Sequence, residues 1–297
     1  MRIPETHAPP GHHGPTALVV VNGDDVFEDL FTAAAELQAV LTDEGFATRT
    51  GTGMGRFEHA VRDDLIVLCT ALGEFTTGQR RGLREAVRAG AGLLAFHATN
   101  VPASASADPD EADRLLTELI GSRYVSHGPR PHESRFGVFP DPAHELTAGL
   151  APFTVTHEHY ALAVEDHAKV VAWRGPLDTT YAMDTTDATG GTDRAHPPHR
   201  TAGAHPPHHS AVAHTARDAD SPHHTAGPHT ARDTHGTTHS APPPLVPLVH
   251  VSEFGRGRVC YVQLGHDMRV WAEPPVRDLI RRAARWVNRL TVQGVAS

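Results

Sequence analysis

The stretch Glu253–Trp271, EFGRGRVCYVQLGHDMRVW, decides the fold of this chain. Its GRG at 255–257 predicts a tight turn that leads into the β-branched and aromatic run at 259–264. The run is followed by GHD at 265–267. A hydrophobic strand that ends on a glycine, an imidazole and a carboxylate is typical of α/β domains, which place polar chemistry at one edge of a sheet.

Before this stretch, short strand-like runs alternate with segments whose apolar residues recur at helical spacing. Strands are expected at 16–21, 46–50, 64–69 and 93–96, and helices at 27–41, 76–89 and 108–120. The first helix is expected to be capped within 22–25 and to bury Leu30, Phe31, Ala34, Leu37 and Leu41. Thr76 and Gln79 predict a capping box for the second. This alternation predicts a doubly wound, mostly parallel α/β sheet.

After residue 124 the pattern changes to shorter strands, and the chain closes with a helix. The strands are expected at 134–139, 153–160, 168–173, 246–252 and 258–264, the last two forming a hairpin. The final helix begins at Pro274-Pro275 and carries five arginines on the face opposite its apolar stripe. These arginines either bind an anionic partner or form a solvated helix face, and the solvated face is the favoured interpretation.

The segment 185–244 interrupts the domain. It contains 11 of the 24 histidines and 9 of the 24 prolines, and Val212 is its one large aliphatic residue. So little apolar surface cannot offset the entropy lost on ordering, so we predict a disordered, histidine-rich insertion. The sequence then divides into a flexible tail at 1–15 and a single α/β domain formed by 16–184 and 245–291. The repeats AHPPH and HTARD within the insertion either chelate Ni²⁺, Zn²⁺ or Cu²⁺ weakly or are an expansion with no selected role, which we favour.

Bulk composition excludes several classes of function. The formal charge of −9 argues against nucleic acid as a partner. The apolar runs are too short to span a bilayer, so no membrane partner is expected. Cys69 and Cys260 each lie inside an apolar run, which predicts buried thiols in a reducing compartment, and we expect a cytoplasmic protein. The GTGMG at 51–55 lacks the spacing of a dinucleotide fingerprint, so no nucleotide cofactor is expected.

Two single histidines are the first candidates for chemistry. His97 follows the apolar run 93–96, where strand-to-helix elbows of α/β folds present a nucleophile. It is a metal ligand, a general acid or base, a hydrogen-bond partner of the substrate, or a structural histidine, and the local sequence leaves these open. His127 lies in the loop sequence YVSHG, and this local sequence alone favours a surface histidine over a ligand.

Two clusters complete the candidate set. In an extended His157-Glu158-His159-Tyr160, Glu158 and Tyr160 share one face, which suits proton transfer or recognition of sugar hydroxyls. The two histidines share the other face and are a weak metal signal. His266 and Asp267 either line a cleft or have a structural role, with Asp267 capping the following turn.

Taken together, these motifs resemble the ThuA-like (trehalose utilisation) family. The resemblance covers about 17–174 and 245–290. It is carried by Phe96-His97-Ala98, His127, His144 in the DPAHELTAGL segment, Glu158, Tyr160 and GRGRVCYVQLGHD. It implies a flavodoxin-like or class I glutamine amidotransferase-like sheet. The chain departs from the family's pattern at His157, where an acidic residue is frequent, and in the long histidine-rich insertion.

The resemblance implies carbohydrate metabolism, with a small sugar or keto-glycoside as the substrate. His97, Glu158, Tyr160, His266 and Asp267 are then the candidate catalytic residues. A divalent metal, Zn²⁺ for preference, is expected on His97, His127, Glu158 and His266. Glutaminase activity is not expected, because His97 stands where amidotransferase chemistry needs a cysteine. The alternative is a non-catalytic carbohydrate-binding or interaction module with the same fold.

Overall fold

The computed structural model describes residues 14–23, 29–71, 73–103, 110–128, 131–176 and 245–289. The predicted tail, apart from its last two residues, and the predicted insertion at 185–244 lie outside these ranges.

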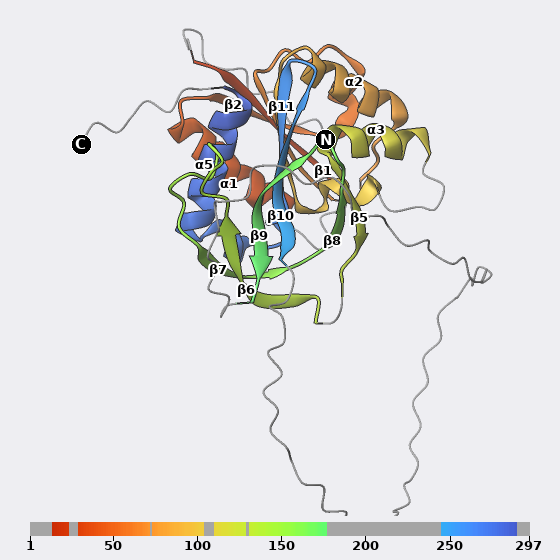
Figure 1. The fold of residues 1–297 in the computed structure, drawn as a ribbon. Coiled ribbons are helices and arrows are strands. Elements are labelled where there is room, and N and C mark those ends of the chain that lie inside the picture. The colour runs from red at the N-terminus through yellow and green to blue at the C-terminus, as the bar shows by residue number, and fades with distance from the viewer. Residues whose placement is uncertain are drawn as a thin grey trace, which may run out of the picture. The chain divides into compact units, whose positions relative to one another are not determined.

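A nine-stranded sheet forms the centre of the described part of the chain (Figure 1). In spatial order its strands are β2 (Ala47–Thr52), β1 (Thr16–Gly23), β3 (Leu65–Ala71), β4 (Gly92–Phe96), β11 (Gly257–Val262), β10 (Val246–Phe254), β9 (Lys169–Gly175), β6 (Glu133–Pro140) and β7 (Phe153–Glu158). The first five are mutually parallel, and each later pair is antiparallel. Two successive reversals restore the direction, so β9 and β7 run the same way as the parallel five. The fold is mixed α/β with a mostly parallel sheet, as predicted, and a separate pair, β5 (Ser122–Ser126) and β8 (Ala161–Val164), lies beside it.

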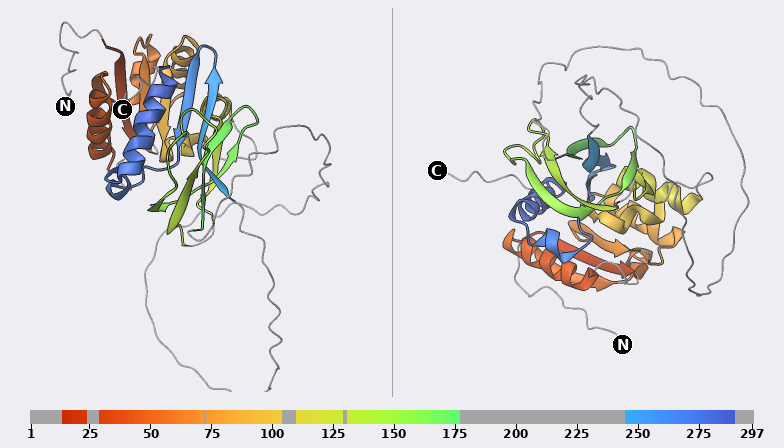
Figure 2. Two further views of the ribbon diagram at one scale, coloured as in Figure 1. Left: turned by 60° about the vertical axis from the view of Figure 1, so that its left-hand side comes forward. Right: turned by 90° about the horizontal axis from the view of Figure 1, so that it is seen from below.

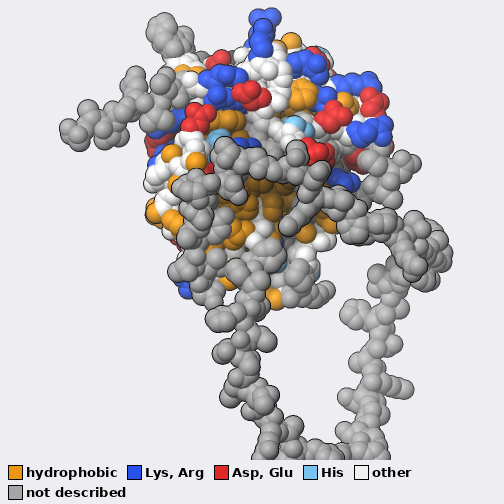
Figure 3. Space-filling model, in the orientation of Figure 1, with side chains coloured by type: hydrophobic (Ala, Val, Ile, Leu, Met, Phe, Trp, Pro, Cys, Tyr) orange, Lys and Arg blue, Asp and Glu red, His pale blue; other side chains and the backbone are white. Residues whose placement is uncertain are grey.

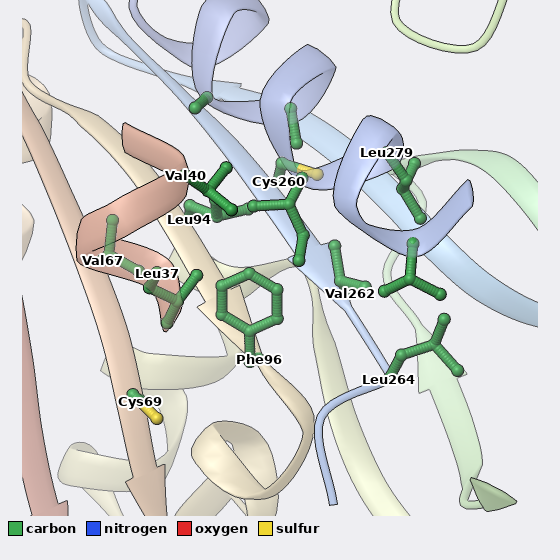
Figure 4. Close-up of a cluster of buried hydrophobic side chains, with 14 of the residues drawn as sticks. Leu37, Val40, Val67, Cys69, Leu94, Phe96, Cys260, Val262, Leu264 and Leu279 are labelled. Carbon is green, nitrogen blue, oxygen red and sulfur yellow. The ribbon is translucent and has the colours of Figure 1, made fainter. Parts of the chain in front are cut away.

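Helices cover both faces of the parallel half of the sheet (Figure 2). Alternate strand residues divide between two hydrophobic clusters, because successive side chains of a strand point to opposite faces. One cluster joins the sheet to α1 (Leu30–Asp43) and α5 (Pro274–Val287), and Figure 4 shows Leu37 of α1, Phe96 of β4 and Leu279 of α5 among its side chains. The other joins it to α2 (Thr77–Arg88) and α3 (Glu111–Ile120). The remaining helices are short: η1 (Met54–Glu58), η2 (His97–Ala103) and α4 (Met268–Trp271).

The first helix differs from its prediction. It begins at Leu30, and its N-cap is Asp29, whose side chain accepts a hydrogen bond from the Thr32 N–H at 3.0 Å. Phe31 is 53% exposed, although the pattern assigned it to the core. Ala33 and Val40 are buried instead. Phe31 matches the apolar stripe by size and hydrophobicity, whereas the 3.6-residue period of the helix places the smaller Ala33 on the buried face.

The second helix confirms its predicted capping box. The Thr76 hydroxyl accepts from the Gln79 N–H, and the Gln79 side chain accepts from the Thr76 N–H. Ion pairs then join α2 to α3, with Arg84 contacting Glu118 at 2.8 Å. Figure 3 shows arginine and acidic side chains interspersed over this region.

The arginines of α5 are engaged within the domain. Arg277 contacts Glu36, and Arg285 contacts Glu44, so both reach carboxylates of the α1 region. Arg282 contacts Asp278 at 2.8 Å, one turn earlier in α5 itself. These pairs give the arginines a role in helix packing and favour neither an anionic partner nor a purely solvated face. None of the helices in the described ranges has the length and apolar composition needed to cross a bilayer.

The predicted hairpin of β10 and β11 is confirmed, and it turns at Gly255. Gly255 has a φ of +62°, and a Cβ there would lie 2.8 Å from the carbonyl oxygen of Arg88. Glycine is therefore required twice, for the left-handed backbone and for the close approach of α2. The hairpin places β11 beside β4, and this neighbourhood builds the site described next.

Candidate functional site

Three strand ends meet at one edge of the sheet. His97 follows β4, Glu158 ends β7, and the loop with His266 follows β11, and all three strands run in the same direction. Five inter-strand steps separate β4 from β7, about 24 Å in a flat sheet. The antiparallel strands β9, β6 and β7 instead curve round (Figure 2), and His97 Nε2 lies 3.0 Å from Glu158 Oε2. The curvature of the sheet therefore creates the site.

His97 occupies a strained, buried elbow. Its φ is +37°, a left-handed conformation that residues other than glycine seldom adopt, and its side chain is buried. Its Nδ1 lies 2.8 Å from the carbonyl oxygen of Gln263, and its own carbonyl accepts from the Tyr261 hydroxyl at 2.7 Å. The Tyr160 ring stacks on the imidazole, with 4.3 Å between ring centroids. These contacts fix His97 in one orientation.

Glu158 receives three imidazoles. Beyond the His97 contact, His266 Nδ1 lies 3.3 Å from Oε2, and His127 Nε2 lies 3.3 Å from Oε1. Burial by itself raises the pKa of Glu158, but the hydrogen bond from His97 and the charges of His266, His97 and His127 outweigh it and lower the pKa to about 2. The carboxyl group is therefore ionised at any physiological pH.

The hydrogen-bond partners of His97 bear on its protonation. Nδ1 faces a carbonyl oxygen, which only accepts, so Nδ1 carries a proton. In a neutral ring the Nε2 lone pair then faces the Glu158 carboxylate. A cation coordinated by both groups would satisfy this lone pair and the carboxylate together. A carbonyl behind one ring nitrogen is also the usual support of a metal-bound histidine.

His127 and its partner Tyr124 lie beside this group. Tyr124 Oη lies 2.5 Å from His127 Nδ1. Burial, and then the charge of Glu158, raise the pKa of Tyr124, so its hydroxyl keeps its proton. The ionised Glu158 favours a proton on His127 Nε2, and Tyr124 then donates to Nδ1. His127 thereby acts as a hydrogen-bond donor to Glu158.

The candidate metal site consists of three of the four predicted ligands. One ligand atom from each of His97, Glu158 and His266 lies within 4.8 Å of the others. The fourth, His127, is not in this group and contacts the other carboxylate oxygen. The residues therefore fit a three-ligand site with a histidine beside it, an arrangement that leaves a coordination position open, as catalytic zinc sites do.

The histidines that flank Glu158 have other surroundings. His157 is buried, and its Nε2 accepts from the backbone N–H groups of Gly265 and His266, each at 2.9 Å. Burial, followed by the charge of His97, lowers the pKa of His157 to about 3, so the ring is neutral. His159 is also buried. Glu158 and Tyr160 both contact His97, although β7 ends at Glu158 and does not reach Tyr160.

Asp267 has the structural role that the sequence left open. Its side chain accepts from the Arg269 N–H at 2.8 Å and caps α4. It also pairs with the Arg269 guanidinium, which contacts Glu133 as well. Burial acts to raise the pKa of Asp267, but the hydrogen bonds from Arg269 outweigh it, and the pKa is lowered. The structure therefore engages this carboxylate with Arg269.

Sequence reasoning missed two members of the site, Tyr124 and Gln263. Tyr124 lies in β5, three residues before His127, and Gln263 immediately follows β11. A single polar residue within the apolar run 259–264 is the sequence signal that could have identified Gln263. Both cysteines are buried, as predicted, and burial raises the pKa of the Cys260 thiol.

Comparisons with known proteins identify relatives of this site's scaffold. The family model for trehalose utilisation, ThuA, matches residues 17–287. A ThuA-like protein from Bacteroides uniformis is 13% identical with a TM-score of 0.58, and the match covers 95% of each chain. A ThuA-like protein from Parabacteroides merdae is 12% identical with a TM-score of 0.57, covering 95% of this chain and 92% of that one. At these identities the structural likeness shows the fold alone. Among curated proteins, none matches the sequence.

Proposed function

Because this chain belongs to the ThuA (trehalose utilisation) family, we propose that it is a cytoplasmic enzyme of carbohydrate metabolism. It acts on a sugar or keto-glycoside at the edge of the sheet where His97, Glu158 and His266 meet. A divalent cation, Zn²⁺ for preference, assists the reaction.

The observation that carries the proposal is the spacing around Glu158. Two ligands on one tetrahedral Zn²⁺ lie about 3.3 Å apart, because each metal–ligand bond is about 2.0–2.1 Å. The distances from His97 Nε2 and His266 Nδ1 to Glu158 Oε2 are 3.0 and 3.3 Å. The Gln263 carbonyl orients His97 as the outer shell of a metal site does.

The chain's own groups divide the remaining work. When bound, the cation supplies a Lewis acid for a substrate carbonyl or hydroxyl oxygen. The His127 side chain is 40% exposed, compared with 22% for His266 and 3% for His97, so His127 is the most accessible of the three imidazoles for exchanging a proton with a substrate carbon next to a carbonyl. Tyr124 holds His127 in place. The Tyr160 ring, stacked on His97, closes one side of the site against water.

Zinc stoichiometry of the full-length chain tests this proposal. The histidines of 185–244 contribute the same background to every variant, so the differences between variants report the site. Wild type and a variant of the exposed surface residue, His59→Ala, are expected to bind one Zn²⁺ more per chain than His97→Ala or Glu158→Gln. If all four proteins bind the same number of Zn²⁺ ions per chain, and His97→Ala turns over sugar at the wild-type rate, the metal-assisted function is wrong.

A non-catalytic carbohydrate-binding module is the second candidate, and His157 favours it. This residue is neutral and engaged with backbone N–H groups, so the position beside Glu158 supplies no second carboxylate. Calorimetry against simple sugars and their keto forms, followed by product analysis, separates the two candidates. Binding without conversion supports the module.

A further inference from the structure

Arg174 is a half-buried cation at the edge of the sheet that carries the site. It lies near the end of β9, which runs in the same direction as β4, β11 and β7. Its guanidinium lies 5.9 Å from the Phe136 ring centre, and its Nη2 donates to the Tyr160 carbonyl at 3.5 Å. Arg174 therefore contacts the backbone of a residue whose ring stacks on His97.

Arg174 has no acidic partner in the described part of the chain. Burial alone lowers its pKa, with no contribution from a carboxylate. Its Nε is buried and makes no hydrogen bond to any described residue. A guanidinium withdrawn from water without a counter-charge is costly, and proteins usually pair such a group.

The contact with Tyr160 does not account for the burial of Arg174. The same carbonyl already accepts from Gln263 Nε2 at 3.1 Å, a shorter bond from a neutral amide. A long, second hydrogen bond to a satisfied carbonyl recovers little of the cost of burying a charge. The fork of Arg174 is therefore available for another acceptor.

Two histidines extend this donor cluster toward the site. His159 is buried, and its ring lies 6.4 Å from Phe136, the same ring that the Arg174 guanidinium faces. The Nδ1 atoms of His159 and His132 are both buried and find no hydrogen-bond partner among the described residues. The His159 N–H donates to the His132 carbonyl at 3.1 Å, and the His132 ring lies 5.2 Å from that of His127. The cluster thus borders His127 and, through Tyr160, His97.

We infer that Arg174, with His159 and His132, forms a subsite for an oxyanion carried by the substrate, so the sugar handled at Glu158 bears a carboxylate or a phosphate ester. The planar fork of an arginine binds either group with two parallel hydrogen bonds. This inference rests on the proposed function, because it assigns the substrate class of the same site. It adds that a neutral sugar is the poorer ligand.

Calorimetry on the full-length chain tests the subsite with three probes: glucose, glucuronate and glucose 6-phosphate. Wild type is expected to bind at least one of the two anionic sugars ten or more times more tightly than glucose, and the preferred probe identifies the oxyanion. Arg174→Gln is expected to reduce that preference below threefold, because the anionic sugars lose the contact with the guanidinium. Arg174→Lys, which keeps the charge and loses the fork, is expected to be intermediate. Arg135→Gln is the matched control, because Arg135 is exposed on the neighbouring strand β6.

The outcomes separate the subsite from the proposed function. Equal affinity of wild type for all three sugars, or a preference that persists in Arg174→Gln, overturns the subsite and leaves the function standing. If the preference for anionic sugars depends on Arg174, the subsite is supported. If Glu158→Gln at the same time binds every sugar as wild type does, the proposed function is overturned. No binding of any probe overturns both. If Arg174→Gln does not fold, Arg174→Lys decides, and a full wild-type preference in that variant overturns the bidentate subsite.

Discussion

The Nε2 atom of His157 lies 2.9 Å from the backbone nitrogen of His266 and accepts its hydrogen. The same atom accepts from Gly265, also at 2.9 Å. On the other side of its ring, Nδ1 donates to the carbonyl oxygen of Glu158. His157 therefore ties the end of β7 to the loop after β11 and sets the position of His266 relative to Glu158. Its ring also meets the His97 imidazole edge-on, with 5.1 Å between ring centroids.

Replacing His157 by an apolar residue is expected to loosen the site. His157→Leu removes the acceptor of two partly buried N–H groups, those of Gly265 and His266, and an unsatisfied group costs up to about 1–3 kcal/mol. We expect Zn²⁺ affinity to fall about 10- to 100-fold, the usual effect of losing an outer-shell contact. His157→Gln keeps an acceptor and should recover much of the loss. A competition titration with a chromophoric chelator measures both variants, and wild-type affinity in a folded His157→Leu protein would contradict the positioning role.

The parallel half of the fold was predictable because its signals are local. The strand predicted at 64–69 is observed at Leu65–Ala71 and is buried on both faces, and the capping box of Thr76 and Gln79 marks a helix start within four residues. Phe31 shows the limit of local signals: its size predicts burial, the helical period places it on the outer face, and it is exposed in the structure.

The site was predictable only as a set of strand ends. His97 and His266 follow adjacent parallel strands, so their proximity follows from the topology. Glu158 ends a strand five steps from β4, and only the curvature of the antiparallel strands brings it back. The pairing of Tyr124 with His127 depends on β5, which pairs with β8 outside the main sheet. No local pattern encodes the long-range contact between His97 and Glu158.

The hydroxyl of Tyr124 is expected to fix the tautomer of His127. With Tyr124 donating to Nδ1, the ring proton stays on Nε2, facing Glu158. Tyr124→Phe removes the donor and should let both tautomers populate. Long-range ¹H–¹⁵N NMR of the His127 ring distinguishes the two states. If the wild-type ring already carries its proton on Nδ1, the assignment of donor and acceptor is wrong.

Gly255 is expected to tolerate alanine far less well than Gly45. Both have positive φ, +62° and +84°, so each substitution incurs about 1 kcal/mol of backbone strain. A Cβ at Gly45 meets nothing within 4 Å, whereas at Gly255 it meets the Arg88 backbone at 2.8 Å. We expect Gly255→Ala to lose about 2 kcal/mol or more beyond the loss in Gly45→Ala. Urea denaturation of the two variants measures the difference, and equal midpoints would rule out the steric argument.

Buried His250 is expected to make the domain sensitive to acid. Its Nε2 lies 3.1 Å from the Ile120 carbonyl oxygen, and burial, opposed by this bond and reinforced by the charge of His167, lowers its pKa to about 4. In the unfolded chain histidine titrates near 6.5. Between pH 6.5 and pH 4, His250 is protonated in the unfolded chain but remains neutral in the folded protein. The stability contribution is therefore complete above pH 6.5 and is lost as the pH falls toward 4.

His250→Gln isolates this effect, because glutamine can still donate to the Ile120 carbonyl and does not titrate. We compare the change in unfolding free energy between pH 7 and pH 4.5 in each protein, which cancels the packing cost of the substitution. The variant should lose about 2.5 kcal/mol less than wild type over this interval. His59→Gln, at an exposed position, should behave as wild type does. Identical pH profiles for wild type and His250→Gln would contradict the prediction, because they would show that His250 takes up its proton in the folded protein.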